Sequence, residues 1–197
     1  MEEESDQQSK RSTRKECFSR IKALSSKERT AASVAICAHI LGLEDFRKAD
    51  TILGFLAMPS EPNLSPVIWR EDKAWGFSRV EADGKIAFFH AAEASDLVIG
   101  THGFLEPVQS LTNEVPDDQV DLVLIPGVGF DPVSGDRIGR GKGHYDRYLS
   151  RLLATPSPPV LIGVAFSVQL TTLEAEAHDI PMNGIVTEHG LVIPPGN

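Results

Sequence analysis

The residues best suited to chemistry lie in one short stretch, DRIGRGKGHYDRYL, at positions 136–149. Glycines occupy every second position from Gly139 to Gly143, and a helical pattern begins near the last of them. The backbone N–H groups of such a segment, together with the positive end of the helix dipole, commonly bind phosphate oxygens. Three cations could add charge-assisted hydrogen bonds, and they are Arg137, Arg140 and Lys142. The stretch therefore predicts a phosphate-binding loop.

Neither of the two common nucleotide-binding glycine motifs fits this loop. The dinucleotide motif GxGxxG would need glycine at His144, and the P-loop motif would need serine or threonine at Gly143. The spacing alone also allows a surface loop whose glycines serve turns and whose cations are solvated. On the glycine spacing alone, both interpretations stay open.

Three short apolar runs predict the elements that must position this loop. They lie at 51–57, 120–126 and 160–166, and helical patterns separate them. Uninterrupted apolar strands that alternate with helices are typical of a sheet covered on both faces. We therefore expect an α/β fold, a single-domain three-layer α/β/α structure with a mixed, mostly parallel sheet.

Helical periodicity predicts two helices near the N-terminus. The first runs from about Arg14 to Leu24, and the second follows a capping-box pattern formed by Ser25 and Glu28 and ends near Gly42. The helix after the glycine loop would bury Tyr145, Tyr148, Leu149 and Leu152. Further predicted elements are a helix over 65–72, a strand over 85–91, and a terminal hairpin over 184–194 that turns at His189 and Gly190.

The composition limits the class of protein. With 197 residues, 41% of them hydrophobic, and no apolar run of about 18, we expect one domain and no membrane partner. The net charge of -9 argues against a nucleic-acid partner, because such surfaces need positive potential. Cys17 and Cys37 show no metal-ligand spacing and are expected to be buried or idle thiols. We expect a polar, disordered tail over 1–9, a domain over 10–197 and a cytoplasmic location.

A longer window, IPGVGFDPVSGDRIGRGKGHYDRYL at 125–149, resembles the signature of the 5-formyltetrahydrofolate cyclo-ligase family. That signature is close to PG-x-x-F-D, a glycine turn, and then R-[LI]-G-R-G-x-G-Y-Y-D. Other segments resemble the family in order and rough spacing: KRSTR, GFLAMPSEPN, GTHGFLEP, and GVAFSVQL with AEAHDIPMNGIVTE. The resemblance covers almost the whole chain from Lys10 onward.

The resemblance implies a ligase that uses ATP and Mg²⁺. Its implied partners are ATP and 5-formyltetrahydrofolate, with or without a polyglutamyl chain, and its product is 5,10-methenyltetrahydrofolate. Because a formamide oxygen is a poor leaving group, ATP would phosphorylate it, N10 of the folate would attack the activated carbon, and phosphate would leave as the ring closes. Such a reaction requires mainly that the protein position the two substrates and supply positive charge around the transferred phosphoryl group.

The resemblance also implies roles for individual residues. Arg140 and Lys142 would stabilise the transferred phosphoryl group, and Asp146 and Asp179 would bind Mg²⁺. The residues implied to bind ATP are Lys10, Arg14, Arg137, Ile138, Gly139, Arg140, Gly141, Lys142, Gly143, His144 and Tyr145. Those implied to bind the folate are Leu56, Glu61, His102, Arg140, Gly141, Lys142, Gly143 and His144. At His144 and His102 the chain departs from the aromatic residues that the family tends to carry.

Simpler interpretations exist for single residues and for the whole chain. Lys10 and Arg14 could form a solvated helix face, Asp146 could complement a helix dipole, and Asp179 could favour a turn. Two other functions stay open because a fold does not fix a function. One is a non-catalytic folate or nucleotide-binding module. Such a module would be expected to lack its metal-binding residues, and here both aspartates are present. The other is a sugar-phosphate isomerase or CoA-transferase-like enzyme, which would require no nucleotide.

Overall fold

The three apolar runs form the parallel centre of a mixed β-sheet. The computed structural model describes residues 2–69, 72–81, 84–100, 103–108, 113–174 and 179–195. The main sheet of this described part contains β1 Thr51–Gly54, β2 Ala74–Val80, β3 Ile86–His90, β6 Leu122–Pro126, β9 Val160–Val164, β10 Gly184–Thr187 and β11 Gly190–Val192. These strands run in the order β11-β10-β9-β6-β1-β2-β3, with antiparallel pairing only at the two edges. The predicted mixed, mostly parallel sheet is confirmed.

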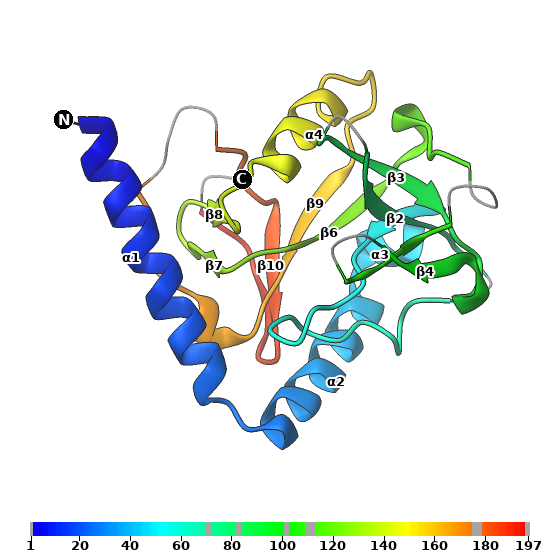
Figure 1. The fold of residues 1–197 in the computed structure, drawn as a ribbon. Helices are drawn as coiled ribbons and strands as arrows, with labels where there is room; N and C mark the ends of the chain where they lie inside the picture. Colours follow the sequence, from blue (N-terminus) through cyan, green and yellow to red (C-terminus); the bar gives the residue numbers. More distant parts are fainter. Residues whose placement is uncertain are drawn as a thin grey trace.

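Helices cover both faces of the sheet (Figure 1). The α-helices are α1 Glu2–Ala23, α2 Ser26–Gly42, α3 Glu44–Lys48 and α4 His144–Leu152, and the 3-10 turns are η1 Ala94–Asp96, η2 Asp117–Gln119 and η3 Ser167–Gln169. Side chains alternate between two core clusters: Ile52 of β1 packs in the cluster with α1, α2 and α3, whereas Leu53 packs in the cluster with α4. The three predicted layers are therefore present.

Helix α1 is longer than the sequence indicated. It begins at Glu2, so residues 2–9 are helical where we expected a disordered tail. No glycine or proline occurs before Gly42, and Glu, Gln, Lys and Arg have high helix propensities. The helix therefore continues through the polar segment, whereas the domain boundary at Lys10 stays a prediction.

Two further differences concern the connection after β1 and the strand that follows it. The predicted helix over 65–72 is wrong for the described residues, which form turns. Trp69 adopts φ 66°, a left-handed conformation that ends helical geometry. Strand β2 was not predicted, because its sequence AWGFSRV mixes glycine and polar residues with aromatic ones. Gly76 is required there, since a Cβ atom would lie 2.7 Å from side-chain atoms of Leu53 and Val115.

Short hairpins complete the fold. β4 Leu97–Ile99 pairs with β5 Leu105–Pro107, and β7 Gly129–Phe130 pairs with β8 Arg137–Ile138. The predicted terminal hairpin is confirmed as β10 and β11, although its turn is formed by Glu188 and His189, one residue earlier than predicted. Among the described residues, no helix combines the length and apolar character needed to cross a membrane. The cytoplasmic location stays a prediction.

Candidate active site

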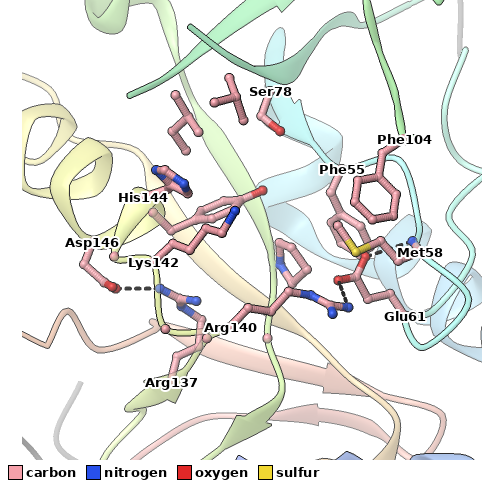
Figure 2. Close-up of a pocket in the computed structure, with 18 of the residues that line it drawn as sticks. Phe55, Met58, Glu61, Ser78, Phe104, Arg137, Arg140, Lys142, His144 and Asp146 are labelled. Carbon is pink, nitrogen blue, oxygen red and sulfur yellow. Dashed lines mark hydrogen bonds and ion pairs between the residues drawn. The ribbon is translucent and has the colours of Figure 1, made fainter. Parts of the chain in front are cut away.

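A cavity of about 540 Å³ opens beyond the carboxyl ends of β1 and β6. Phe55 directly follows β1 and Pro126 ends β6, and both residues line the cavity. This is the place where open α/β sheets bind ligands. Every site residue predicted from the sequence lines the cavity, except His102, which lies outside the described residues. Figure 2 shows the central part of this arrangement.

The glycine-rich loop forms the basic wall of the cavity. Gly141 and Gly143 adopt φ values of 88° and 61°, which glycine tolerates better than other residues. Gly143 precedes α4, and no side chain in the described part of the chain caps that helix N-terminus. The first backbone N–H groups of α4 have no intrahelical partner and can bind an anion. The geometry is compatible with phosphate binding, which stays a prediction.

Helix α1 brings two more cations to the same loop. The Nε of Arg14 donates a hydrogen bond to the carbonyl oxygen of Gly139 over 2.9 Å. The Nζ of Lys10 lies 3.1 Å from a carboxylate oxygen of Asp179. The interpretation of Lys10 and Arg14 as a solvated face is therefore wrong, although their binding of ATP stays a prediction.

The two aspartates predicted to bind metal both line the cavity. Asp146, in the first turn of α4, accepts a hydrogen bond from the buried Arg137, and Asp179 pairs with Lys10. In the described part of the chain, no three or more His, Cys, Asp or Glu side chains gather as a metal cage. Mg²⁺ does not require such a cage, because it usually binds one or two carboxylates together with substrate phosphates and waters. The residues present fit that requirement.

Arg140 crosses the cavity from the glycine loop toward the connection after β1 (Figure 2). Its Nη2 donates to Ser60 Oγ over 2.9 Å and to Glu61 Oε1 over 3.3 Å. The other oxygen of Glu61, Oε2, accepts a hydrogen bond from the backbone N–H of Met58. The predicted phosphate side and the predicted folate side are thus joined directly.

Two aromatic side chains of α4 lie beside the loop. Burial raises the pKa of the Tyr145 phenol, and the nearby Glu61 carboxylate acts in the same direction, against the smaller influences of Arg137 and a hydrogen bond with Ser78. The phenol therefore stays protonated and can donate a hydrogen bond. At His144, Nδ1 accepts a hydrogen bond from Arg147 over 3.3 Å, so Arg147 orients the imidazole ring.

Comparison with known proteins identifies the family of this chain. Residues 6–188 match the sequence model of the 5-formyltetrahydrofolate cyclo-ligase family. The chain belongs to this family. The 5-formyltetrahydrofolate cyclo-ligase of Mus musculus is 26% identical over 190 residues, which cover 91% of this chain and 93% of the mouse protein. The cyclo-ligase of Escherichia coli K12 is 31% identical over 145 residues, which cover 71% of this chain and 78% of that protein.

A solved structure shows the same fold for a related protein. The NMR structure of Aquifex aeolicus 5,10-methenyltetrahydrofolate synthetase has a TM-score of 0.81 and 29% identity, and the match covers 94% of this chain and 93% of that one. The predicted family, fold class and ligase class are confirmed.

Sequence reasoning missed the apolar wall of this cyclo-ligase family member. Opposite the glycine loop, the cavity is lined by the apolar side chains of Phe55, Met58, Phe77, Val80, Ile86, Phe104 and Leu105, together with the polar Ser78 and Glu106. Several of these residues belong to β2 and β3, two neighbouring strands of which only β3 was predicted. The signal in the sequence is the segment AWGFSRV. Its identification as a strand near the edge of the sheet would have placed its carboxyl end at the cavity.

Proposed function

We propose that the protein catalyses the ATP- and Mg²⁺-dependent conversion of 5-formyltetrahydrofolate to 5,10-methenyltetrahydrofolate, with release of ADP and phosphate. The observation that carries the proposal is that the basic glycine loop and the Glu61 carboxylate face one another across one cavity (Figure 2). A nucleotide bound at the loop and a pterin bound at Glu61 would bring the γ-phosphate and the formyl group into the same space. Membership of the cyclo-ligase family supports the same reaction.

The reaction has two steps. First, the formyl oxygen attacks the γ-phosphorus of ATP, the bond between that phosphorus and the β,γ-bridging oxygen breaks, and ADP leaves. Then the lone pair of N10 attacks the activated formyl carbon, and the carbon–oxygen bond breaks with its electrons on the departing phosphate. The proton of N10 ends on that phosphate. Both steps depend on the relative position of the reacting groups, which the protein must fix.

The cations of the basic wall supply the electrostatic part of this mechanism. Lys142 and Arg140 would stabilise charge on the transferred phosphoryl group, because preorganised charges aimed at a transition state lower its free energy. Arg137, Lys10 and Arg14 would hold the remaining phosphates together with the loop backbone. Asp146 and Asp179, with phosphate oxygens, would hold Mg²⁺, which would neutralise phosphate charge when bound.

The apolar wall supports the second step. Phe55, Phe77 and Phe104 line the side of the cavity that faces the loop, so a folate bound there would exclude water from the activated formyl carbon. The protonated phenol of Tyr145 can donate a hydrogen bond to a ligand without removing a proton from it. Hydrolysis of the phosphorylated intermediate would be slowed, and attack by N10 would be favoured.

An absorbance assay for 5,10-methenyltetrahydrofolate tests the proposal. We expect product only when ATP, Mg²⁺ and 5-formyltetrahydrofolate are all present, with one ADP for each methenyl group formed. Product formation without ATP would overturn the proposal and favour an isomerase-like activity. Tight binding of both ligands without turnover would instead indicate a binding module.

A further inference from the structure

Arg140 is held on the folate side of the cavity, away from the glycine loop that carries it. Its Nη2 donates to Ser60 Oγ over 2.9 Å and to Glu61 Oε1 over 3.3 Å, and its guanidinium carbon lies 5.4 Å from the ring centroid of Phe18. Figure 2 shows the side chain directed toward Glu61 and away from Lys142. In this position the guanidinium forms an ion pair with the Glu61 carboxylate and is turned away from the predicted phosphate site.

The two members of this ion pair differ in their surroundings. The Glu61 side chain is 9% exposed, and its Oε2 is fixed by the backbone N–H of Met58, whereas the Arg140 side chain is 43% exposed. Arg140 is therefore the member that can turn away into the cavity. Because a buried carboxylate is costly without a partner, Glu61 releases Arg140 readily only when another donor replaces it.

We propose that Ser60 and Glu61 couple the binding of the two substrates through Arg140. A pterin whose N–H groups donate to Glu61 would displace Arg140, which could then turn to the phosphates of ATP. Conversely, phosphates that attract Arg140 would leave Glu61 available to the pterin. Each substrate then binds more tightly when the other is present, and by linkage the factor is the same in both directions. This inference rests on the proposed function.

Ser60 is the positioning residue in this arrangement. Its hydroxyl accepts the shorter of the two hydrogen bonds from Arg140, but it carries no charge and does not line the cavity. Loss of that hydroxyl should weaken the hold on Arg140 without removal of a group that contacts either substrate. Ser60→Ala therefore separates the coupling from substrate binding itself.

Calorimetric titration with a non-hydrolysable ATP analogue and Mg²⁺, in the absence and presence of 5-formyltetrahydrofolate, tests the coupling. For the wild type we expect the folate to tighten nucleotide binding about fivefold, near the lower end of usual linkage between sites. Ser60→Ala should tighten binding of the nucleotide alone by about threefold, as expected for one hydrogen bond lost from the competing state. Its affinity with folate present should match the wild type, so the coupling factor falls.

Ser65→Ala is the matched control. Ser65 lies in the same connection after β1, and its hydroxyl donates to Asn63 Oδ1 over 2.6 Å rather than to Arg140. This variant should keep the wild-type coupling. Glu61→Gln, measured with the nucleotide alone, is a second probe and should also bind the analogue more tightly than the wild type, because it lacks the charge that holds Arg140.

The outcomes distinguish this inference from the function on which it rests. Equal nucleotide affinity of the wild type with and without folate would overturn the coupling and leave the proposed function standing. A coupling factor unchanged in Ser60→Ala, or no tightening in Glu61→Gln, would overturn the role of the Ser60–Glu61 pair. Failure of the wild type to bind the nucleotide under either condition would overturn both proposals.

Discussion

At the scale of single residues, several charged side chains that we predict to bind ligands form ion pairs with one another in the cavity. Arg137 pairs with Asp146, Lys10 with Asp179, and Arg140 with Glu61. Such pairs satisfy buried or half-buried charges before a ligand is bound. Lys142 differs, because it is exposed and forms no ion pair with any residue that the structure describes. It is therefore the cation most available to a transferred phosphoryl group.

Replacement of Lys142 by alanine should lower turnover far more than stability. Loss of a charge that acts on the transition state should raise the barrier by about 2–4 kcal/mol, as for other preorganised electrostatic groups. Stability should hardly change, because the side chain is exposed. Steady-state kinetics and thermal denaturation measure the two effects. Lys27→Ala, which removes an exposed lysine on α2, is the control, and near wild-type turnover of Lys142→Ala would exclude this role.

Asp179→Asn should raise the Mg²⁺ concentration needed for half-maximal activity by about tenfold, equivalent to roughly 1.4 kcal/mol. Binding of 5-formyltetrahydrofolate without nucleotide should stay nearly unchanged, because the predicted folate-binding carboxylate is Glu61. Since Asp179 also pairs with Lys10, Lys10→Gln shows how much of the effect comes from loss of that pair. Unchanged Mg²⁺ dependence in Asp179→Asn would remove this aspartate from the metal site.

At the scale of elements, the hairpin of β10 and β11 is tied to η3 by one carboxylate. Glu188, in the hairpin turn, accepts hydrogen bonds from the backbone N–H and the hydroxyl of Ser167 over 2.8 and 2.6 Å. Burial alone would raise the pKa of Glu188, but the hydrogen bonds from Ser167, a further backbone hydrogen bond and the nearby His189 together outweigh it, so the pKa lies below the ordinary value of 4.5. The folded state therefore favours the ionised carboxylate.

This shift predicts how stability depends on pH. Because the folded-state pKa is lowered, the contribution of Glu188 is present above pH 4.5 and is lost as the pH falls through the folded-state pKa. The free energy of unfolding of Glu188→Gln should thus be lower than that of the wild type at pH 7, and the difference should shrink toward pH 3. Urea denaturation across this range measures it. Ser167→Ala should show the same trend. A difference in the free energy of unfolding that stays constant between pH 7 and pH 3 would contradict the lowered pKa of Glu188.

The elements also show which parts of the fold the sequence could predict. The strands β1, β6 and β9 were predicted because burial on both faces leaves an uninterrupted apolar run. The segment 65–72 was misread because Val67 and Ile68 are buried, as in a helix, but reach the core from turns. In the site, the glycine loop was predicted because its glycines and cations are adjacent in sequence. The apolar wall was not, since the tertiary packing of β2 and β3 decides which aromatic residues face the cavity.

At the scale of the whole molecule, segments far apart in sequence close the cavity. Helix α1 lies beside β7 and β8 (Figure 1), and its Cys17 is buried in a cluster with Val128 and Ile138. The same helix carries Lys10 to Asp179 and Arg14 to the carbonyl oxygen of Gly139. The predicted phosphate side is therefore complete only when α1 is packed against η3 and β7.

Removal of residues 1–9 should keep turnover and ATP affinity, because Lys10 is the first residue of α1 that lines the cavity among those whose side chains the structure describes. A deletion that extends through Arg14 should weaken ATP binding by about tenfold or more, since a hydrogen bond from a charged donor contributes roughly 1.5–3 kcal/mol. The full-length variant Lys10→Ala with Arg14→Ala separates the loss of these side chains from the shortening of the helix, and should reproduce the weaker binding. The ATP concentration for half-maximal rate and the midpoint of thermal unfolding measure affinity and folding in each protein. Weaker ATP binding after removal of residues 1–9 alone would show that the polar start of α1 belongs to the functional domain, contrary to the predicted boundary at Lys10.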